Sequence, residues 1–431
     1  MESAVPEYIL DTVRLLPPLP AAVERLLELA RDPNSDFRLI SDVIETDQTL
    51  TARTLRAANS ALYGVTRRVQ TVRQAIVLLG RDAVMGLAIG ASVLGLQNSI
   101  KRRWPLDSDA LWRHTVGVAI IARTMASQLG VGDPDEAFVA GLLHDIGKII
   151  MLDHFGELYG QVLMTAQYGA NPLHVIEREV FSTDHAVVGH ALCLHWNIPS
   201  AITRAVAEHH EDVDPAPNSL ADIVRDANEI MKLFAFADGG NRFVQLRTSR
   251  LLPHNQIRPD RLREMIVELP GAVKDAELVF GSEPAGNRLA NEDRGDRPLV
   301  HMQITVPEER DMLVAMLWGM GYEPVMLNDT LALPRTSSDE AALAGVLTDI
   351  PLSPERQFVY RSLNIPILDY SAWRGSRQHL IPVGHFNVFD LRAWITSGLM
   401  ALTDRVEVRS EASFDLPKMR MDLRSSAVHT G

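Results

Sequence analysis

The stretch from Gly141 to Lys148, with the sequence GLLHDIGK, restricts the fold and chemistry of this chain more than any other feature. It lies at the end of an apolar run with helical spacing, which predicts one helix over residues 136–150. Within five residues it supplies an imidazole, a carboxylate and an ammonium, at His144, Asp145 and Lys148. These three side chains make the stretch the first candidate for a functional site.

Further histidines lie on both sides of this stretch. His114 precedes it in a predicted helix, and His185 and the pair His209-His210 follow it. Imidazole nitrogens with one carboxylate oxygen suit zinc or another transition metal in a hydrolytic site. Four other histidines are interpreted as hydrogen-bonded core residues: His154, His174, His190 and His195.

Length and composition limit the class of protein. A chain of 431 residues is too long for one ordinary core and predicts two or three domains. The net charge of −13 argues against a broad nucleic-acid surface, so we expect no nucleic-acid partner. The single cysteine, Cys193, fits a reducing compartment. The N-terminus lacks the pattern of a signal peptide and the apolar window 83–96 is too short to span a bilayer, so we expect a cytoplasmic protein without a membrane partner.

Residues 1–105 are predicted to form an all-helical module, because apolar residues recur at helical spacings without strand-like alternation. Ser35 and Asp47 are the predicted N-caps of two of its helices. The segment from Thr71 to Gln74 is a capping box that starts another helix. This half of the helical domain shows no catalytic pattern.

Asn59, Ser60 and Tyr63 are the polar residues of interest in this module. The structural interpretation, which we favour, is that Asn59 and Ser60 satisfy backbone groups at a helix end. The functional interpretation is that the three residues form a partner-binding corner.

Four ordered blocks of this region resemble the HDOD domain, a bacterial signalling module related to the HD phosphohydrolases. They are LPPLP at 16–20, DQTLTAR at 47–53, ANSALYG at 58–64 and AIVLLG at 75–80. The resemblance extends from about residue 15 to about residue 235. It implies one helical domain with an N-terminal half over 1–105 and an HD-like half over 106–282.

The resemblance also implies roles for the candidate residues. His114 matches the first metal ligand of HD phosphohydrolases, and His144 with Asp145 matches their His-Asp pair. Lys148 matches a lysine that holds a phosphate oxygen or assists proton transfer. His185, His209 and His210 match additional histidines of the HD-GYP phosphodiesterases. The implied cofactor is a divalent transition metal, Fe, Mn or Zn.

Two departures from these families bear on catalysis. Asn228 stands where the late metal-binding aspartate is expected, and Asp226 is predicted to lie on a different helical face. An amide oxygen is a weaker, uncharged ligand than a carboxylate. The Gly-Tyr-Pro that follows the histidine pair in HD-GYP proteins is also missing after Glu211. Metal binding needs only the ligands, whereas turnover also needs an open coordination position.

The C-terminal part has a different pattern. Helical runs up to residue 280 are expected to break at Pro253, Pro259 and Pro270, and residues 283–299 form a predicted linker. Strands are predicted at 300–306, 324–327, 344–349 and 365–370, alternating with helices, which indicates an open α/β sheet. A flexible tail is expected over 405–431.

Residues 300–404 resemble a degenerate response-regulator receiver domain. By this resemblance Asp349 matches the phosphoacceptor, and Glu308 and Glu309 lie near the acidic pair that holds magnesium. Pro307 stands at one acidic position, and the expected Lys-Pro is missing from 382–386. These departures argue against magnesium binding and phosphorylation, so we expect a domain used for protein contacts.

The sequence therefore predicts a multidomain protein, an all-α HDOD/HD-like domain followed by a smaller α/β receiver-like domain. The leading hypothesis is a non-catalytic regulatory protein that contacts other signalling proteins or senses a nucleotide second messenger. The alternative is a metal-dependent phosphohydrolase or phosphodiesterase that acts on a nucleotide or a cyclic dinucleotide. Whether the chain forms a homodimer stays open.

Overall fold

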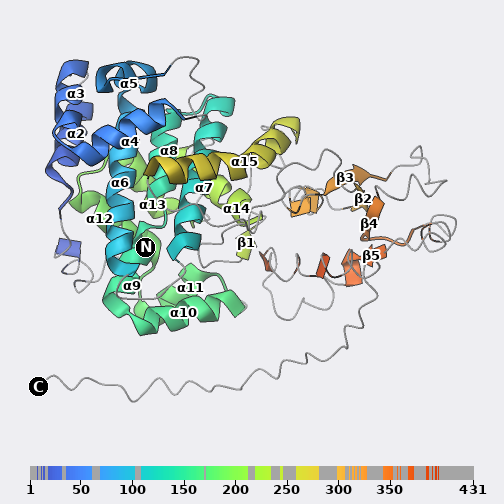
Figure 1. Cartoon of the computed structure of the whole chain (residues 1–431). Coiled ribbons are helices and arrows are strands. Elements are labelled where there is room, and N and C mark those ends of the chain that lie inside the picture. Colours follow the sequence, from blue (N-terminus) through green and yellow to red (C-terminus); the bar gives the residue numbers. More distant parts are fainter. Residues whose placement is uncertain are drawn as a thin grey trace, which may run out of the picture.

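The structure is a computed structural model in which most of the helical part of the chain is described. The described residues are 18–31, 35–60, 68–101, 108–168, 171–211, 219–233, 243–245, 259–280, 299–305, 322–327, 343–352, 367–372 and 385–387, with isolated residues around them. Figure 1 shows the helices gathered in one body and strands β2 to β5 drawn at the other side of the view.

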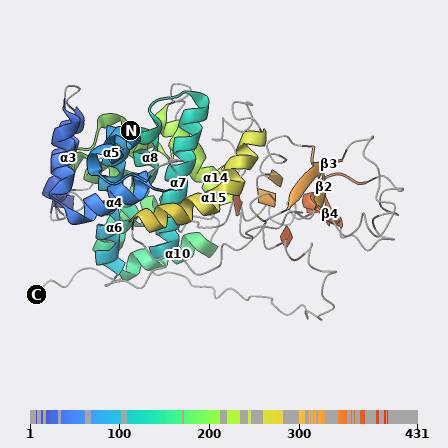
Figure 2. The same ribbon diagram turned by 45° about the horizontal axis from the view of Figure 1, so that its top comes forward.

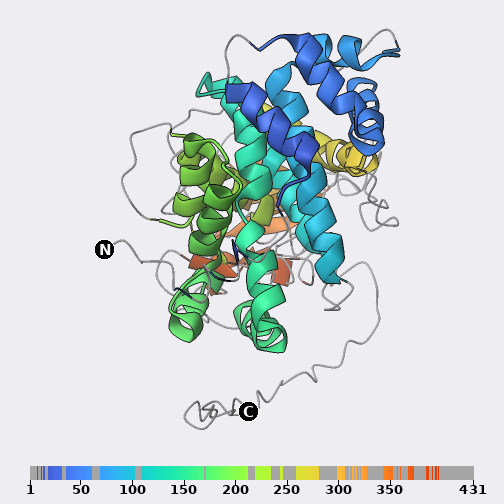
Figure 3. The same cartoon turned by 90° about the vertical axis from the view of Figure 1, so that its left-hand side faces the viewer.

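Helices make up most of the described N-terminal residues, as the apolar spacings predict: α2 (Ala21–Arg31), α3 (Phe37–Glu45), α4 (Gln48–Ala58), α5 (Val72–Leu79) and α6 (Arg81–Lys101). Helices α3 and α4 pack against α5, and α2 and α4 pack against α6. Their buried apolar side chains, including Ile40, Ile44 and Ile76, join one core with the helices that follow. In Figure 3 the dark blue helices from the start of the chain lie at one end of the helical body, and green helices lie at the other.

Two of the predicted helix starts are confirmed and one is wrong. Asp47 caps α4 and Thr71 caps α5 through side-chain oxygens. The N-cap of α3 is Asp36, whose carboxylate accepts a hydrogen bond from a backbone N–H, and not the predicted Ser35. Serine and aspartate cap helices about equally well, so adjacent candidates are not separated by residue type alone.

The second half of the domain adds the helices that surround the candidate site: α7 (Ser108–Leu129), α8 (Pro134–Leu143), α9 (Ile146–Phe155), α10 (Glu157–Tyr168), α11 (Leu173–Phe181), α12 (His185–His195), α13 (Ser200–Glu208) and α14 (Leu220–Leu233). Helix α7 packs against α8 and α14, and α12 packs against α9 and α13. The single helix predicted over 136–150 is wrong, because the chain breaks between α8 and α9 at His144 and Asp145. The apolar periodicity is continuous through this region, but α9 packs against α12 and does not continue α8.

Helix α15 (Pro259–Phe280) closes the helical body and runs through Pro270, where the sequence predicted a break. It lies across α4, α6 and α7, as Figure 2 shows. The ring of Phe280 makes an edge contact with Trp112 at 5.3 Å between centroids. The carbonyl of Leu278 accepts a hydrogen bond from Arg56 of α4 at 3.2 Å. These contacts hold the helix in place despite the backbone N–H that proline lacks.

The C-terminal part contains a parallel sheet of β2 (Leu299–Gln303), β3 (Glu323–Met326), β4 (Leu343–Thr348) and β5 (Ile367–Asp369). Its order is β3-β2-β4-β5, so β2, the first of these four strands along the chain, lies inside the sheet between β3 and β4. The predicted positions of these strands are confirmed. An unpredicted antiparallel pair also joins β1 (Phe243–Gln245) to β6 (His385–Asn387). Such three-residue strands leave too little sequence for a period-two pattern.

Taken one at a time, the described helices are all too short or too polar to cross a bilayer. Helices α5 and α6 would pass a test of length and composition together, but the chain bends by 110° between them.

Candidate metal centre

The six residues that the sequence selected as metal ligands meet at one place in the helical body, which we name the histidine–aspartate cluster: His114, His144, Asp145, His185, His209 and His210. His114 comes from α7, His144 and Asp145 from the break between α8 and α9, His185 from the start of α12, and the histidine pair from the end of α13. Five of the six are almost fully buried, and His210 is half-buried. The structure thus brings the predicted residues together in positions where they could hold a metal ion.

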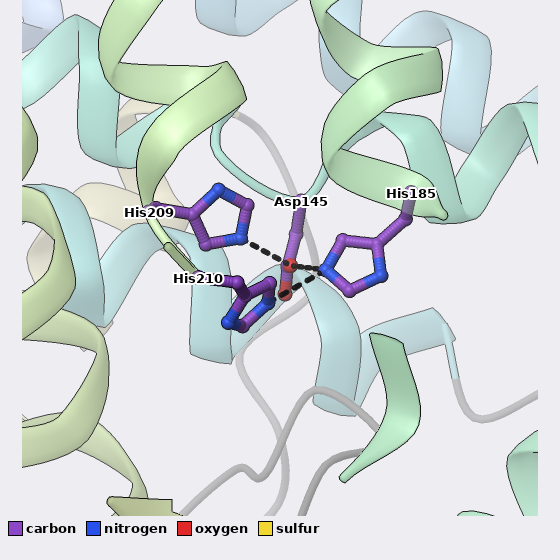
Figure 4. A group of neighbouring side chains, drawn as sticks. All are labelled: Asp145, His185, His209 and His210. Carbon is purple, nitrogen blue, oxygen red and sulfur yellow. Dashed lines mark hydrogen bonds and ion pairs between the residues drawn. The ribbon is translucent and has the colours of Figure 1, made fainter. Parts of the chain in front are cut away.

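The carboxylate of Asp145 lies at the centre of the cluster, and each of its two oxygens faces a different pair of histidines. Its Oδ2 is 3.2 Å from Nε2 of His144 and 3.6 Å from Nε2 of His114. Its Oδ1 is 3.3 Å from Nε2 of His185 and 3.8 Å from Nε2 of His209 (Figure 4). Nε2 of His185 is in turn 2.9 Å from Nε2 of His210. The ammonium of Lys148 lies 2.7 Å from Oδ2.

The position of Asp145 in the chain explains why its carboxylate points inward. It is the N-cap residue of α9, a position where aspartate normally accepts a hydrogen bond from the helix backbone. Here the side chain makes no such bond. Helix α9 therefore lacks the stabilisation of a side-chain cap at this residue, and the carboxylate points toward the histidines.

Two glycines allow the helices that carry the ligands to approach closely. A Cβ on Gly147 of α9 would lie 1.9 Å from the carbonyl oxygen of His185. A Cβ on Gly141 of α8 would lie 2.7 Å from the Cα of Ala119 in α7. Larger residues at either position would separate the helices, so the two glycines of the GLLHDIGK stretch set the distances within the cluster.

Hydrogen bonds to Nδ1 orient the rings of three of the candidate ligands. His144 and His209 are the C-caps of α8 and α13, and Nδ1 of each lies 2.7 Å from a backbone carbonyl three residues earlier. A carbonyl oxygen only accepts, so Nδ1 carries the proton in both rings. Nδ1 of His185 lies 2.6 Å from a carboxylate oxygen of Glu177 and donates to it. In the neutral form of each ring, Nε2 is then the nitrogen with the free lone pair, and that nitrogen can bind a metal.

These lone pairs face carboxylate oxygens. Among the described atoms, Nε2 of His144, Nε2 of His209 and Oδ1 of Asp145 are buried and have no hydrogen-bond partner. Buried polar atoms without partners cost free energy, and acceptors that face acceptors also repel one another. A cation between them removes both penalties. The donor set therefore fits a divalent metal ion, and nitrogen with one oxygen suits the transition metals rather than calcium or magnesium.

The charge states of the side chains agree with this fit. Burial opposes ionisation of Asp145, but His144, Lys148 and His185 together hold the pKa of its carboxyl well below its ordinary value. Burial and neighbouring histidines hold the pKa values of His209 and His210 well below that of a free imidazole. The aspartate is thus an anion and the two histidines are neutral near pH 7, as metal ligands must be.

Two residues that support the cluster were not found from the sequence. Glu177 of α11 is fully buried, and one of its oxygens accepts hydrogen bonds from both the backbone N–H and Nδ1 of His185. Its other oxygen accepts a hydrogen bond from the hydroxyl of Tyr159, with 2.5 Å between the two oxygens. The available signal was a carboxylate on the apolar face of a short helix, four residues after Leu173.

Other predicted residues lie in different surroundings. Asn228 of α14 is buried against the helical body, and its side-chain oxygen has no hydrogen bond to the described atoms. Asp226 is also buried, but it belongs to neither group of potential metal ligands found among the described residues. Tyr63, Glu308 and Glu309 lie outside the described residues.

The prediction that four histidines belong to the core is correct for one of them. His174 is buried and its ring stacks on that of His210, with centroids 4.4 Å apart. His154 and His195 are exposed, and His190 is half-buried. His154 and His195 lie in the last turns of α9 and α12, where an exposed basic side chain interacts favourably with the helix dipole.

Asn59 has the structural role that the sequence favoured. Its amide group donates to the carbonyls of Leu55 and Val69, and its oxygen accepts from the backbone N–H of Val69. The hydroxyl of Ser60 donates to the carbonyl of Ala57 at 2.8 Å. Both residues hold the end of α4 and the chain that returns to it.

In the sheet, Asp349 directly follows the carboxyl end of β4. Its Oδ2 accepts hydrogen bonds from the backbone N–H of Thr305 at 2.7 Å and from the hydroxyl of Thr305 at 2.6 Å. Thr305 follows the neighbouring strand β2. One carboxylate oxygen of Asp349 is thus engaged in linking two strand ends.

The fold and the cluster together define a helical domain with a metal-type histidine–aspartate site. Residues 16–212 match the HDOD domain family. A solved HDOD domain protein of unknown function from Geobacter sulfurreducens shares the fold with a TM-score of 0.54 and 26% identity, over 64% of this chain and 99% of that one. Residues 16–212 of this chain therefore carry an HDOD domain, and that expectation from the sequence is confirmed.

Curated relatives match the chain at lower coverage. An uncharacterized protein of Treponema pallidum is 23% identical over 245 residues, which are 56% of this chain and 47% of that protein. Ribonuclease Y of Opitutus terrae is 24% identical over 246 residues, which are 51% of this chain and 41% of that protein. The chain spans less than half the length of these two relatives.

Proposed function

We propose that this chain is a bacterial signal-transduction protein whose HDOD domain binds a partner protein or a ligand and does not catalyse a reaction. In this proposal the histidine–aspartate cluster holds one or more divalent transition-metal ions, Fe, Mn or Zn. The ion supplies positive charge between buried acceptors and ties together the helices α7, α9, α12 and α13. Metal binding then stabilises the folded domain in the manner of a structural metal.

The observation that carries the proposal is the amide at position 228. A hydrolytic HD site takes a carboxylate from the late helix, and here that residue is Asn228, buried in α14. Helix α14 packs against α7 and α8, the helices that bring His114 and His144 to the cluster. An ion on that side lacks one anionic ligand, which weakens its binding and its ability to activate water.

Burial of the cluster supports the same conclusion. His114, His144 and His185 are completely inaccessible to solvent, and Asp145 is 2% exposed. A phosphodiester substrate needs a path to the ion and an open coordination position on it. The burial of these side chains favours an ion held for structure over an ion that meets a substrate.

The C-terminal part is proposed to be a receiver-like domain used for protein contacts. The strand order β3-β2-β4-β5 is consistent with the first four strands of a flavodoxin-like sheet, to which receiver domains belong. The hydrogen bonds from Thr305 to Asp349 favour a structural role for the carboxylate over a phosphoacceptor role. The corner that contains Asn59 and Ser60 stays a candidate surface for another signalling protein.

The second candidate function is a metal-dependent phosphohydrolase that acts on a nucleotide or a cyclic dinucleotide. Lys148 favours it, because a buried ammonium beside a metal-binding carboxylate is suited to hold a phosphate oxygen. The similarity to ribonuclease Y adds RNA to the substrates worth testing. In such an enzyme the ion would activate water for attack on the phosphoester.

Turnover distinguishes the two candidates. The full-length chain is supplied in turn with Fe(II), Mn(II) and Zn(II), and the hydrolysis of cyclic dinucleotides, nucleotides and RNA is measured. We expect no hydrolysis above that of Asp145→Ala, which serves as the control for contaminating activity. Metal-dependent hydrolysis that disappears in Asp145→Ala would overturn the regulatory proposal and establish the phosphohydrolase.

A further inference from the structure

Helix α5 exposes apolar side chains that no other described part of the chain covers. Figure 1 shows this helix at an outer edge of the helical body, where it packs against α3, α4 and α6. On the side away from these helices, Val77 is 71% exposed and Leu78 is 42% exposed. In the adjacent helix α3, Phe37 and Leu39 are exposed as well. Neighbouring apolar side chains at a surface are typical of a site of contact with another molecule.

The chain around α5 is basic, although the whole protein is acidic. Residues 48–81 contain six arginines and no aspartate, glutamate or lysine, whereas the full chain has a net charge of −13. Arg68 and Arg73, beside the start of α5, are exposed and form no ion pair with the residues that the structure describes. A local basic surface on an acidic protein selects for a partner with acidic groups.

The position of Arg73 is unfavourable for the helix that carries it. Arg73 lies in the first turn of α5, where the helix dipole is positive and acidic side chains are stabilising. That turn contains no acidic residue. A charge that conflicts with its own helix is expected at a functional site more than at an ordinary surface position. The arginines and the dipole together make this end of α5 suited to carboxylates from outside the chain.

Hydrogen bonds hold the segment that carries Arg68 in place. The side-chain oxygen of Asn59 accepts from the backbone N–H of Val69 at 2.8 Å, and its amide nitrogen donates to the carbonyl of Val69 at 2.9 Å. The hydroxyl of Thr71 then accepts from the backbone N–H of Gln74 at 3.2 Å. A partner would therefore meet a preformed surface, which lowers the entropy that binding costs.

We propose that this surface, which we name the α5 face and define by Arg68, Arg73, Val77 and Leu78, binds an acidic amphipathic helix of another protein. The apolar stripe of that helix covers Val77 and Leu78, and its carboxylates pair with the two arginines. This inference rests on the proposed partner-binding function, and it adds the surface that binds and the chemistry of the partner.

Two other kinds of partner fit the α5 face less well. Phosphate groups of a nucleic acid would pair with the arginines but would leave the aliphatic side chains uncovered, and α5 has no aromatic residue on which a base could stack. An anionic membrane surface would be repelled by the net charge of the protein. An acidic helix satisfies both the apolar and the basic parts of the face.

The experiment is a selection of helical peptides by the full-length chain from a phage-displayed library with randomised surface positions. The enriched peptides are expected to be acidic and to carry apolar residues three and four positions apart, which lie on one face of a helix. The best peptide is then labelled with a fluorophore, and its affinity is measured by anisotropy. Replacement of its acidic residues by glutamine is expected to weaken binding and to remove most of the dependence on salt.

Substitutions in the α5 face test where the peptide binds. Val77→Ser is expected to weaken binding by about 10-fold or more, because burial of one aliphatic side chain is worth at least that factor. Arg73→Glu is expected to weaken binding of the acidic peptide and to favour a charge-swapped peptide with lysines in its place. Met164→Ser and Arg204→Glu make the same kinds of change at exposed positions of α10 and α13 and are expected to leave binding unchanged. Thermal unfolding confirms that each variant is folded.

Several outcomes would overturn the inference. One is a selection that enriches no peptide or enriches basic peptides. Another is an affinity that is unchanged in both Val77→Ser and Arg73→Glu, which would place the contact elsewhere on the chain. Binding of a single-stranded oligonucleotide, or of vesicles of equal parts phosphatidylcholine and phosphatidylserine, that is lost in Arg73→Glu would replace the protein partner by a nucleic acid or a membrane.

Two further measurements complete the test. Sedimentation of the wild type is expected to show no self-association that Val77→Ser abolishes, and such self-association would make a second copy of the chain the occupant of the α5 face. Metal-dependent hydrolysis by the chain would overturn the proposed function while leaving the peptide affinities as they are. Failure of this inference and failure of the proposed function are therefore distinguishable.

Discussion

Gly147 and His185 lie in direct backbone contact, and a Cβ on Gly147 would come within 1.9 Å of the carbonyl oxygen of His185. The same Cβ would lie 2.7 Å from the backbone nitrogen of Gly189. Asp145 and His185 lie at the starts of α9 and α12, so this contact between the two helices sets the distance between them in the histidine–aspartate cluster. The glycine of the HDIGK sequence is therefore required by packing, whatever the chemistry of its neighbours.

Gly147→Ala is expected to destabilise the domain and to separate its ligands. Because the clash is with backbone atoms, the helices must move apart, which costs on the order of 3 kcal/mol. Gly160→Ala is the matched control, since Gly160 is also helical and has open space around its Cα. That substitution is expected to raise the free energy of unfolding by about 0.5–1 kcal/mol. Urea unfolding of both variants measures the difference, and equal stability would contradict the close contact.

The metal-free protein is expected to lose stability as the pH falls from about 6.5 to about 5. Burial lowers the pKa of His174 from 6.5 to about 3, and those of His209 and His210 shift in the same direction. Below 6.5 the unfolded chain takes up protons that the folded chain refuses, so acid favours unfolding. His174 alone accounts for about 1.5 kcal/mol over this interval.

Urea unfolding in the presence of a chelator checks this pH dependence. His174→Phe is expected to reduce the dependence, because it removes one group that is neutral only in the folded state. His195→Gln, at an exposed position, is expected to leave it as in the wild type. A stability that stays constant from about pH 6.5 to about pH 5 would show that these histidines are not held neutral by the fold.

Glu177→Gln is expected to lower the affinity for Zn(II) by about 10- to 100-fold, because it removes the negative charge behind His185. Tyr159→Phe removes one hydrogen bond from the same carboxylate, and we expect a smaller decrease in the same direction. Glu179→Gln makes the same chemical change at an exposed position of α11 and serves as the control. Competition with a chromophoric chelator gives the affinities. Equal values for Glu177→Gln and Glu179→Gln would remove Glu177 from the metal site.

Acetyl phosphate is expected to leave no label on Asp349. Its Oδ2 is bonded to both the backbone N–H and the hydroxyl of Thr305, and Oδ1 is buried. Intact-mass measurement after incubation with acetyl phosphate and magnesium would detect an added phosphoryl group. A stable adduct on Asp349, absent from Asp349→Asn, would show a working phosphoacceptor.

The sequence was sufficient for the parts of the fold that rest on apolar periodicity and for the ligands that stand in recognisable motifs. His114 and Asp145, which are 31 positions apart, were each selected because they matched a family position, and their side chains lie 3.6 Å apart in the structure. Local sequence patterns did not predict the helix boundaries correctly where two patterns pointed to different boundaries. Adjacent Ser35 and Asp36 were both good caps, and the apolar run through His144 concealed a break that only the packing of α9 on α12 explains.

The residues around the ligands were harder to predict, because their roles depend on contacts between helices. Glu177 supports His185 from another helix, and its position in the sequence gives no sign of that partner. The ring N–H bonds of His144 and His209 arise because both rings follow a helix end and reach its last free carbonyls. The orientation of the imidazoles therefore depends on helix termini that periodicity places only approximately.

Equilibrium titration of the chelator-treated chain with Zn(II) tests metal binding by the histidine–aspartate cluster most directly. We predict at least one equivalent bound by the wild type and none at the same concentrations by Asp145→Ala, since Asp145 is the only carboxylate among the six residues of the cluster. Binding should also raise the free energy of unfolding by about 2.7 kcal/mol at a free Zn(II) concentration of about 100 times the dissociation constant. No Zn(II) uptake by the wild type, or equal uptake by Asp145→Ala, would contradict a metal site at this cluster.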